Sequence, residues 1–281
     1  MKIKTNLYLL LITLSFSGSS FAQNRTTDPY PPFRVIGNLY SVGGSDLSVF
    51  LITSDAGHIL INTGWGDSTA LIRDNIASLG FSLDDVEILL AQHAHGDHTG
   101  ALAEIKQLTG AQMWASAEDT PVLEDGGFSD PQFGGRQGFE PVEVDRIFNQ
   151  GDSIELGENR LTAHIHPGHT EGATSFTMTV RENGRDYRVL IANMGSVNAG
   201  KRLAVNPTYP GVAADFAYTF TTQKAMDIDV WVSAHGNQYN RDDKWQPGQA
   251  YSPDTFVDPD GFKAKVEDYQ TLFLEALAEE H

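Results

Sequence analysis

The chain has 281 residues, of which 40% are hydrophobic and 20% charged, the composition of an ordinary globular protein. Its 37 acidic side chains outnumber 19 basic ones and give a formal net charge of −18. This acidity argues against nucleic acid as a partner, because proteins bind polyanions through lysine and arginine. The chain has no cysteine, which excludes disulfides, a thiolate nucleophile and a zinc site built on sulfur.

Residues 1–22 have the pattern of a secretory signal peptide. Two lysines are followed by the apolar run Leu7–Phe16 and by the small-x-small cleavage signal Ser20–Ala22. The apolar run is shorter than the about 20 residues that a membrane-spanning helix needs. We therefore expect cleavage after Ala22 and a soluble, periplasmic and monomeric mature protein, residues 23–281, without a membrane partner.

Short apolar segments alternate with helical patterns in the first half of the mature chain. Asp67–Leu79 is predicted to be a helix, because its leucines and isoleucines form one face and a glycine follows it. The apolar strand Val86–Leu90 runs directly into a histidine-rich loop, and Thr99–Thr109 returns to helical spacing. Three further strands are predicted at Leu39–Val42, Val49–Thr53 and His58–Ile61.

Strands and helices stay mixed in the second half. The last predicted helix, Pro259–Glu279, has Asp258 as its N-cap and a continuous apolar stripe. The loop Glu118–Asp145 is glycine-rich and irregular, but no linker divides the chain, so we expect one α/β domain. Strands are predicted at Gln112–Ala115, Arg146–Phe148, Arg160–His166, Ser175–Thr179, Tyr187–Ala192 and Asp229–Ser233.

Three histidines and an aspartate gather within residues 93–98, between a predicted buried strand and a helix start. Open α/β sheets place their ligands at such strand ends. His93 and His95, two apart in extended chain, can point to one side and share a metal. Asp97 and His98 follow a glycine that lets the chain turn, and they can reach a second metal. This density of imidazoles predicts a metal site built from nitrogen and oxygen ligands.

Two more histidines follow predicted strands. His169 lies in a tight turn after Arg160–His166, and His235 comes shortly after Asp229–Ser233. Because both occupy strand ends, we expect them to converge on the same edge of the sheet. His58, His164 and His166 are more readily explained as strand residues, although a role behind a metal ligand stays open for one of the latter two. Trp65 either lines the mouth of the site or packs.

The segment His93-x-His95-x-Asp97-His98, followed by His169 and His235, resembles the metallo-β-lactamase superfamily. The resemblance covers nearly all of the mature chain. It implies an αββα sandwich with a two-metal groove along one edge. Members hydrolyse β-lactams, thioesters, lactones, phosphodiesters and sulfate esters, so the motif alone does not identify the substrate.

The segment Ile191–Ser196 indicates which branch of the superfamily the chain resembles. Glyoxalase-like and lactonase-like members have an aspartate there that bridges both metals, and the B1 and B2 β-lactamases have a cysteine. This chain has neither, and in that respect it is similar to the subclass B3 metallo-β-lactamases. Two positions depart from what the resemblance implies. Met194 stands where the common B3 pattern has a serine, and Asn62 stands where the superfamily usually has a structural aspartate.

What the resemblance implies is a β-lactamase that binds two zinc ions per chain. A metal-bound hydroxide would attack the lactam carbonyl without a covalent intermediate, and Asp97 would be the catalytic residue that orients the hydroxide or accepts its proton. The first zinc would be held by His93, His95 and His169, and the second by Asp97, His98 and His235.

Substrate contacts and other functions are less sharply indicated. Ser196 and Asn198 are candidate contacts for the β-lactam carboxylate, with Lys201 close by, and ordinary loop polarity explains them equally well. A lactonase or thioesterase on the same fold is the alternative, against which the missing bridging aspartate argues. A metal-binding protein without activity is a third hypothesis, against which the complete ligand set argues.

Overall fold

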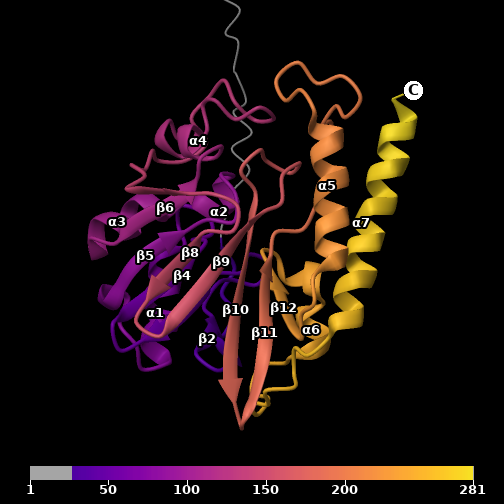
Figure 1. Cartoon of the computed structure of the whole chain (residues 1–281). Helices are drawn as coiled ribbons and strands as arrows, with labels where there is room; N and C mark the ends of the chain where they lie inside the picture. The colour runs from indigo at the N-terminus through magenta and orange to yellow at the C-terminus, as the bar shows by residue number, and fades with distance from the viewer. Residues whose placement is uncertain (1–26, 281) are drawn as a thin grey trace, which may run out of the picture.

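The computed structural model describes residues 27–280, in which two β-sheets pack face to face between outer helices (Figure 1). This arrangement confirms the predicted αββα sandwich. The predicted signal peptide lies outside the described residues. Within residues 27–280, no helix is both long enough and apolar enough to cross a membrane.

The first sheet has seven strands in the order β1-β2-β3-β4-β5-β6-β7. Neighbours are antiparallel up to β4 and parallel from β4 to β7, so that β4, β5 and β6 all end at one edge. The strands are β1 (Phe33–Ile36), β2 (Leu39–Ser41), β3 (Phe50–Ser54), β4 (Gly57–Ile61), β5 (Val86–Leu90), β6 (Gln112–Ser116) and β7 (Arg146–Phe148).

The second sheet has five strands in the order β12-β11-β10-β9-β8. β11 and β12 are parallel, and the other neighbours are antiparallel, so β9, β11 and β12 run in the same direction. Their carboxyl ends therefore share one edge. The strands are β8 (Ser153–Leu156), β9 (Asn159–Ile165), β10 (Thr174–Glu182), β11 (Arg185–Ala192) and β12 (Val230–Ser233).

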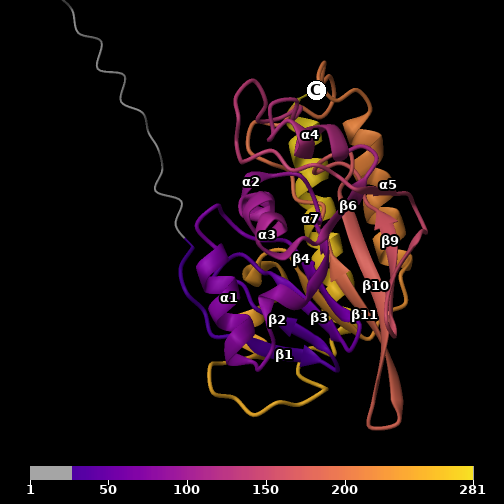
Figure 2. The ribbon, with the colours of Figure 1, turned by 90° about the vertical axis from the view of Figure 1, so that its left-hand side faces the viewer.

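Helices cover the outer faces of both sheets (Figures 1 and 2). α1 and α3 pack on the first sheet, whereas α5 and α7 lie side by side against the second. The helices are α1 (Thr69–Ser78), α2 (Gly96–Thr99), α3 (Leu102–Thr109), α4 (Thr120–Glu124), α5 (Val212–Ala225), α6 (Arg241–Lys244) and α7 (Pro259–Glu279), with single 3₁₀ turns η1 (Leu83–Asp85) and η2 (Gly236–Tyr239).

The central strands of the first sheet, such as β3 and β4, are largely apolar on both faces because both faces are buried. Ile59 and Ile61 of β4 belong to the core between the sheets, whereas Leu60 between them packs toward α1 and α3. This alternation follows from the period of two along a strand. Continuous apolar runs such as β4 and β5 are typical of strands covered on both sides.

Several elements were not predicted from the sequence. The largest is α5, fourteen residues long, and the short elements β1, β8, α4 and α6 were also missed. The predicted loop Glu118–Asp145 therefore begins with one short helix. Asp258 is the N-cap of α7 as predicted, since its side chain accepts a hydrogen bond from the Gly261 backbone N–H at 3.0 Å.

Phe220 of α5 connects the outer helices to the edge where the strands end. It is fully buried, contacts the ring of Phe273 of α7 at a tilted angle, and packs so tightly on Gly195 that a Cβ there would lie 2.7 Å from its ring. Replacing Phe220 by alanine is expected to reduce the free energy of unfolding by about 3–5 kcal/mol, measured by urea denaturation. Tyr218→Ala, on the exposed side of α5, is the control and should cost under about 1 kcal/mol. Equal losses in both variants would contradict this packing.

Candidate metal centre

All six predicted metal ligands lie at the edge where β5, β9 and β12 end. His93, His95, Asp97 and His98 follow β5, His169 follows β9, and His235 follows β12. The turn before His169 requires glycine, because Gly168 has a φ of +124° and a Cβ there would lie 2.7 Å from the Phe216 ring. Thr174 donates a backbone hydrogen bond to the Gln92 carbonyl at 2.7 Å and so joins the two sheets beside the site.

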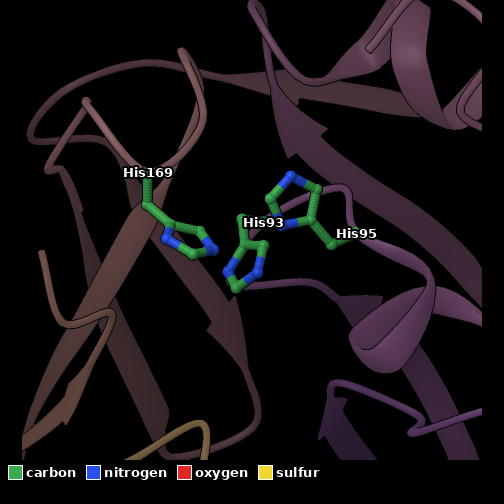
Figure 3. Close-up of side chains that lie close together, drawn as sticks. All are labelled: His93, His95 and His169. Atoms are coloured by element: carbon green, nitrogen blue, oxygen red, sulfur yellow. The ribbon is translucent and has the colours of Figure 1, made fainter. Parts of the chain in front are cut away.

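One group of histidines comes from both sheets. His93, His95 and His169 each offer a ring nitrogen, and these atoms all lie within 4.8 Å of one another. Figure 3 shows the three rings turned toward a common point. All three residues are buried, at 8% exposure or less. Three converging imidazoles are the ligand number and type of a zinc site with an open position.

A second group surrounds the Asp97 carboxylate. Its Oδ2 lies 3.3 Å from His98 Nε2 and 3.6 Å from His235 Nε2. Ligand atoms of His93, Asp97 and His98 also lie within 4.8 Å of one another, so the two groups are adjacent. The second cluster thus shares His93 with the first, and His235 approaches it only through the Asp97 carboxylate, so the division into two triads stays a prediction.

The environment of His93, His98 and His169 favours the neutral form that binds metals. Burial, together with the neighbouring imidazoles, lowers the pKa of His93 well below its ordinary value, and burial lowers the pKa of His169 to about 3. Burial also lowers the pKa of His98, although the Asp97 carboxylate opposes the effect. Neutral imidazole is the form that coordinates a metal.

In the second group, the Asp97 carboxylate and the His235 imidazole favour their charged forms, in contrast to His98. Burial alone would raise the pKa of Asp97, but His98 and His235 outweigh it and hold the pKa below its ordinary value. Burial would lower the pKa of His235, but hydrogen bonding to Asp46 and the charges of Asp97 and Asp46 raise it. Asp97 is therefore ionised at neutral pH.

Hydrogen bonds from residues behind the site determine which ring nitrogen of His93 and of His169 faces the other proposed ligands. The Asn193 side-chain oxygen lies 2.7 Å from His93 Nδ1, and the Ser196 carbonyl oxygen lies 2.8 Å from His169 Nδ1. Because both oxygens accept, each Nδ1 carries the proton and each Nε2 keeps a free lone pair. On the second group, Asp46 Oδ1 lies 3.3 Å from His235 Nδ1.

Several of these supporting groups were not predicted from the sequence. Asp46 lies before β3, far from His235 in the chain. Asp130, in the predicted loop, lies 3.3 Å from His95 Nε2, while Asn193 was considered only as a residue lacking the bridging carboxylate. The sequence offers only one signal for such groups, which is an acidic or amide residue in the segment that follows a strand. Because such residues are common, the signal does not distinguish Asp46, Asp130 and Asn193 from ordinary loop residues.

The asparagine at position 62, in place of the aspartate that the resemblance implies, has a structural explanation. Asn62 is buried with a φ of +64°, accepts from the Gln92 backbone N–H at 2.9 Å, and donates to the Gln92 side-chain oxygen at 2.8 Å. An aspartate would offer only acceptors here. The pair Asn62–Gln92 thus supports the chain directly before His93. Met194, the other departure, is buried in the core between the sheets.

The remaining predicted residues lie as follows. Ser196 contacts His169 through its carbonyl and its hydroxyl, at 2.8 and 3.2 Å. Asn198 is half-buried, and its Nδ2 atom has no hydrogen-bond partner among the described residues. Lys201 donates to the carbonyls of Gly168 and His169, so its ammonium group steadies the His169 turn. Whether Ser196 and Asn198 contact substrate stays a prediction.

The three described histidines outside the site, His58, His164 and His166, lie in or directly after strands of the two sheets. His58 contacts the Phe81 ring edge-on, and His164 lies 2.7 Å from the Thr177 hydroxyl. His166 lies 2.7 Å from the Ser175 hydroxyl, which in turn accepts from the Asn193 backbone N–H at 2.9 Å. His166 is thus linked to His93 through Ser175 and Asn193, and burial lowers the pKa of His166 to about 3.

Comparison with known proteins agrees with this geometry. A model of the metallo-β-lactamase superfamily matches residues 42–181. The structure of a β-lactamase from Chitinophaga pinensis is 42% identical, with a TM-score of 0.89, over 93% of this chain and 99% of that one. The chain belongs to the metallo-β-lactamase superfamily.

Other relatives include a second metallo-β-lactamase and a hydroxyacylglutathione hydrolase. A class B3 di-zinc metallo-β-lactamase from an Alaskan soil metagenome is 43% identical, with a TM-score of 0.87, over 89% of this chain and 95% of that one. The resemblance to subclass B3 proteins is thereby confirmed. A hydroxyacylglutathione hydrolase from Haemophilus influenzae is 34% identical over 131 residues, which are 45% of this chain and 58% of that protein. The chain thus spans less than two thirds of that relative.

Proposed function

We propose that this chain is an exported, zinc-dependent β-lactamase with two zinc ions. The first would be held by His93, His95 and His169, and the second by Asp97, His98 and His235. The observation that carries the proposal is the convergence of these side chains at one sheet edge, in a chain 42–43% identical to β-lactamases over nearly its full length.

The donor atoms fit such metals. The Nε2 atom of His93 is buried and has no hydrogen-bond partner within the described part of the chain, and Nε2 of His98 has only the carboxylate of Asp97, itself a proposed ligand, 3.3 Å away. Buried polar atoms left in this state cost free energy, and metal coordination would remove that cost. A donor set of five imidazoles and one carboxylate suits zinc. When bound, such ions supply Lewis acidity and lower the pKa of water toward neutrality.

The residues of the chain then perform the remaining tasks. Asp97, ionised and close to both His98 and His235, is placed to orient a water molecule and accept its proton. No cysteine is available as a nucleophile, in keeping with direct attack by water and no covalent intermediate. The unpartnered Nδ2 of Asn198 is a donor suited to the β-lactam carboxylate, and Ser196 lies beside it.

A hollow next to the site is suited to the rest of the substrate. It has a volume of about 110 Å³ and reaches His95 and Asp97. Its walls include the aromatic side chains Trp65 and Phe133 and the cationic Arg136. Mixed aromatic and charged walls suit an amphiphilic substrate such as an acylated β-lactam carboxylate. Trp65 is therefore assigned to the mouth of the site.

A thioesterase is the second candidate, favoured by the similarity to hydroxyacylglutathione hydrolase. Against it stands Asn193, at the end of β11 where such enzymes have a bridging aspartate. Its side-chain oxygen is bonded to the outer nitrogen of His93, so it supports a ligand from behind. This arrangement favours the β-lactamase.

Metal dependence can be tested on the chromogenic cephalosporin nitrocefin. Turnover by the purified protein is expected to be lost after treatment with a chelator and restored by zinc, because the metals supply the electrophile. Magnesium, which prefers oxygen ligands, is the control and should not restore turnover. Hydrolysis that survives complete removal of zinc would overturn the proposed mechanism.

A further inference from the structure

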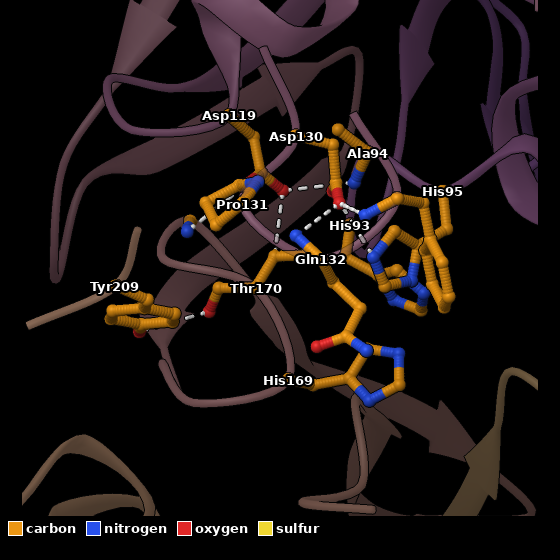
Figure 4. A network of polar contacts seen from close by, with 12 residues as sticks. His93, Ala94, His95, Asp119, Asp130, Pro131, Gln132, His169, Thr170 and Tyr209 are labelled. Atoms are coloured by element: carbon orange, nitrogen blue, oxygen red, sulfur yellow. Dashed lines mark hydrogen bonds and ion pairs between the residues drawn. The ribbon is translucent and has the colours of Figure 1, made fainter. Parts of the chain in front are cut away.

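Asp119 occupies an unusual place for a carboxylate. It stands at the N-cap position of the short helix α4, yet its side chain makes no capping bond to that helix. The carboxylate points instead into the space between the loop after β5 and the turn after β9, where it is 4% exposed (Figure 4). These are the two segments that carry the first group of proposed metal ligands.

Three hydrogen bonds tie the Asp119 carboxylate to both segments. Its Oδ2 accepts from the Ala94 backbone N–H at 3.0 Å and from the Thr170 hydroxyl at 3.1 Å. Its Oδ1 accepts from the Gly172 backbone N–H at 3.0 Å. Ala94 stands between His93 and His95, and Thr170 directly follows His169. One side chain therefore holds all three histidines of the group through their neighbours in the chain.

The backbone near Asp119 is shaped for this approach. A Cβ atom at Gly172 would lie 2.7 Å from the Asp119 Cγ and 2.6 Å from its backbone nitrogen, so only glycine allows the contact. Burying a carboxylate costs several kcal/mol unless hydrogen bonds compensate it. Here burial raises the pKa of Asp119 to about 6 even with these donors. If the Asp119 carboxylate only anchored α4, we would expect it to hydrogen-bond to that helix. It bonds instead to the segments that carry His93, His95 and His169.

We propose that Asp119 is a positioning residue that sets the distance between the His93–His95 segment and His169, and thereby the zinc affinity of that group. The inference rests on the proposed metal centre. All three partners of Asp119 are donors, so both carboxylate oxygens must accept. An asparagine has nearly the same shape but would direct its NH₂ group at one of the donors.

The test compares zinc affinities, measured by competition with a chromophoric chelator. Asp119→Asn is expected to weaken zinc binding at one site by about 10–100-fold, the usual loss when an outer-shell partner of a metal site is removed. Thr170→Val, which removes a single donor, should weaken binding by a smaller factor. Thr170→Ser keeps the hydroxyl and should bind zinc nearly as the wild type does. If Asp119→Asn does not fold, the difference in zinc affinity between Thr170→Val and Thr170→Ser still tests the role of Asp119.

A second control separates positioning from stability. The Thr120 hydroxyl donates to the Ser116 carbonyl at 2.7 Å, so Thr120→Val disturbs the start of α4 without touching the metal loops. It should lower the melting temperature of the metal-free protein while leaving zinc affinity unchanged. Wild-type zinc affinity in both Asp119→Asn and Thr170→Val, with only the metal-free melting temperature lowered, would overturn the role of Asp119.

Failure of the proposed function gives a different result. A wild-type protein that binds zinc but opens no β-lactam would contradict the β-lactamase proposal, and the zinc affinities of the variants would still decide the role of Asp119. A wild-type protein that binds no zinc would overturn both.

Discussion

Replacing His169 by alanine is expected to abolish nearly all hydrolysis and to leave one zinc ion per chain. His169 is the one member of the first group contributed by the second sheet, so no neighbouring side chain replaces its nitrogen. Losing the ion removes several kcal/mol of transition-state stabilisation, which corresponds to about a 10³-fold fall in kcat/KM or more. Steady-state kinetics with nitrocefin and elemental analysis of the same sample measure both effects.

His164→Ala is the matched control for that variant. His164 is a half-buried histidine of β9 that contacts Thr177 and lies outside both groups of ligands. It should keep two zinc ions and turnover close to that of the wild type. Rapid turnover by His169→Ala with a single tightly bound zinc would show that the first group is dispensable.

Asp97→Asn is expected to lower kcat by about 10²–10⁴-fold, the range typical of a lost proton acceptor. The amide keeps the size of the side chain but cannot take a proton at neutral pH. It also removes the negative charge that His98 and His235 face at 3.3 and 3.6 Å, so weaker binding of the second zinc should accompany the loss. Kinetics at saturating zinc separate the two effects, because added metal restores occupancy and not the proton acceptor.

A remote carboxylate provides the control for the charge change. Asp152 accepts from the Asn149 backbone N–H on an exposed turn, and Asp152→Asn should leave kcat and zinc content unchanged. If Asp97→Asn at saturating zinc retained the wild-type kcat, Asp97 would be a structural group and not the proton acceptor.

Most of the strands, and the position of the six proposed ligands after strand ends, could be predicted because their signals are local. The apolar run Val86–Leu90 followed by His93 identifies a strand end, and the same pattern recurs before His169 and His235. Residues at the carboxyl ends of parallel strands meet by geometry. The convergence of six side chains from distant segments thus follows from patterns a few residues long.

Helix α5 was missed because its inner face is not purely apolar. Phe216 and Phe220 are buried there together with the polar Thr219 and Gln223. Thr219 donates to the Pro167 carbonyl, and Gln223 donates to the Asn193 carbonyl. These polar residues interrupt the apolar spacing that identifies an amphipathic helix. Their hydrogen bonds to the site segments become visible only in the folded chain.

The supporting groups were missed for a related reason. Asp46, Asp119 and Asp130 carry no motif, and each contacts a segment that is remote in sequence or separated from it by an irregular loop. Their importance depends on tertiary contacts that local patterns do not encode. Asn62 was singled out as a departure, but its pairing with Gln92 could not be foreseen because both amides must be oriented by the fold.

The most direct test of the central claim is a comparison of kcat/KM for one zinc-loaded preparation on different substrates. A penicillin, a cephalosporin and a carbapenem would be assayed beside a hydroxyacylglutathione thioester and an N-acyl homoserine lactone. The account predicts zinc-dependent opening of at least one β-lactam, with much lower values for the thioester and the lactone. Efficient cleavage of the thioester or the lactone, with no β-lactam turned over, would contradict it.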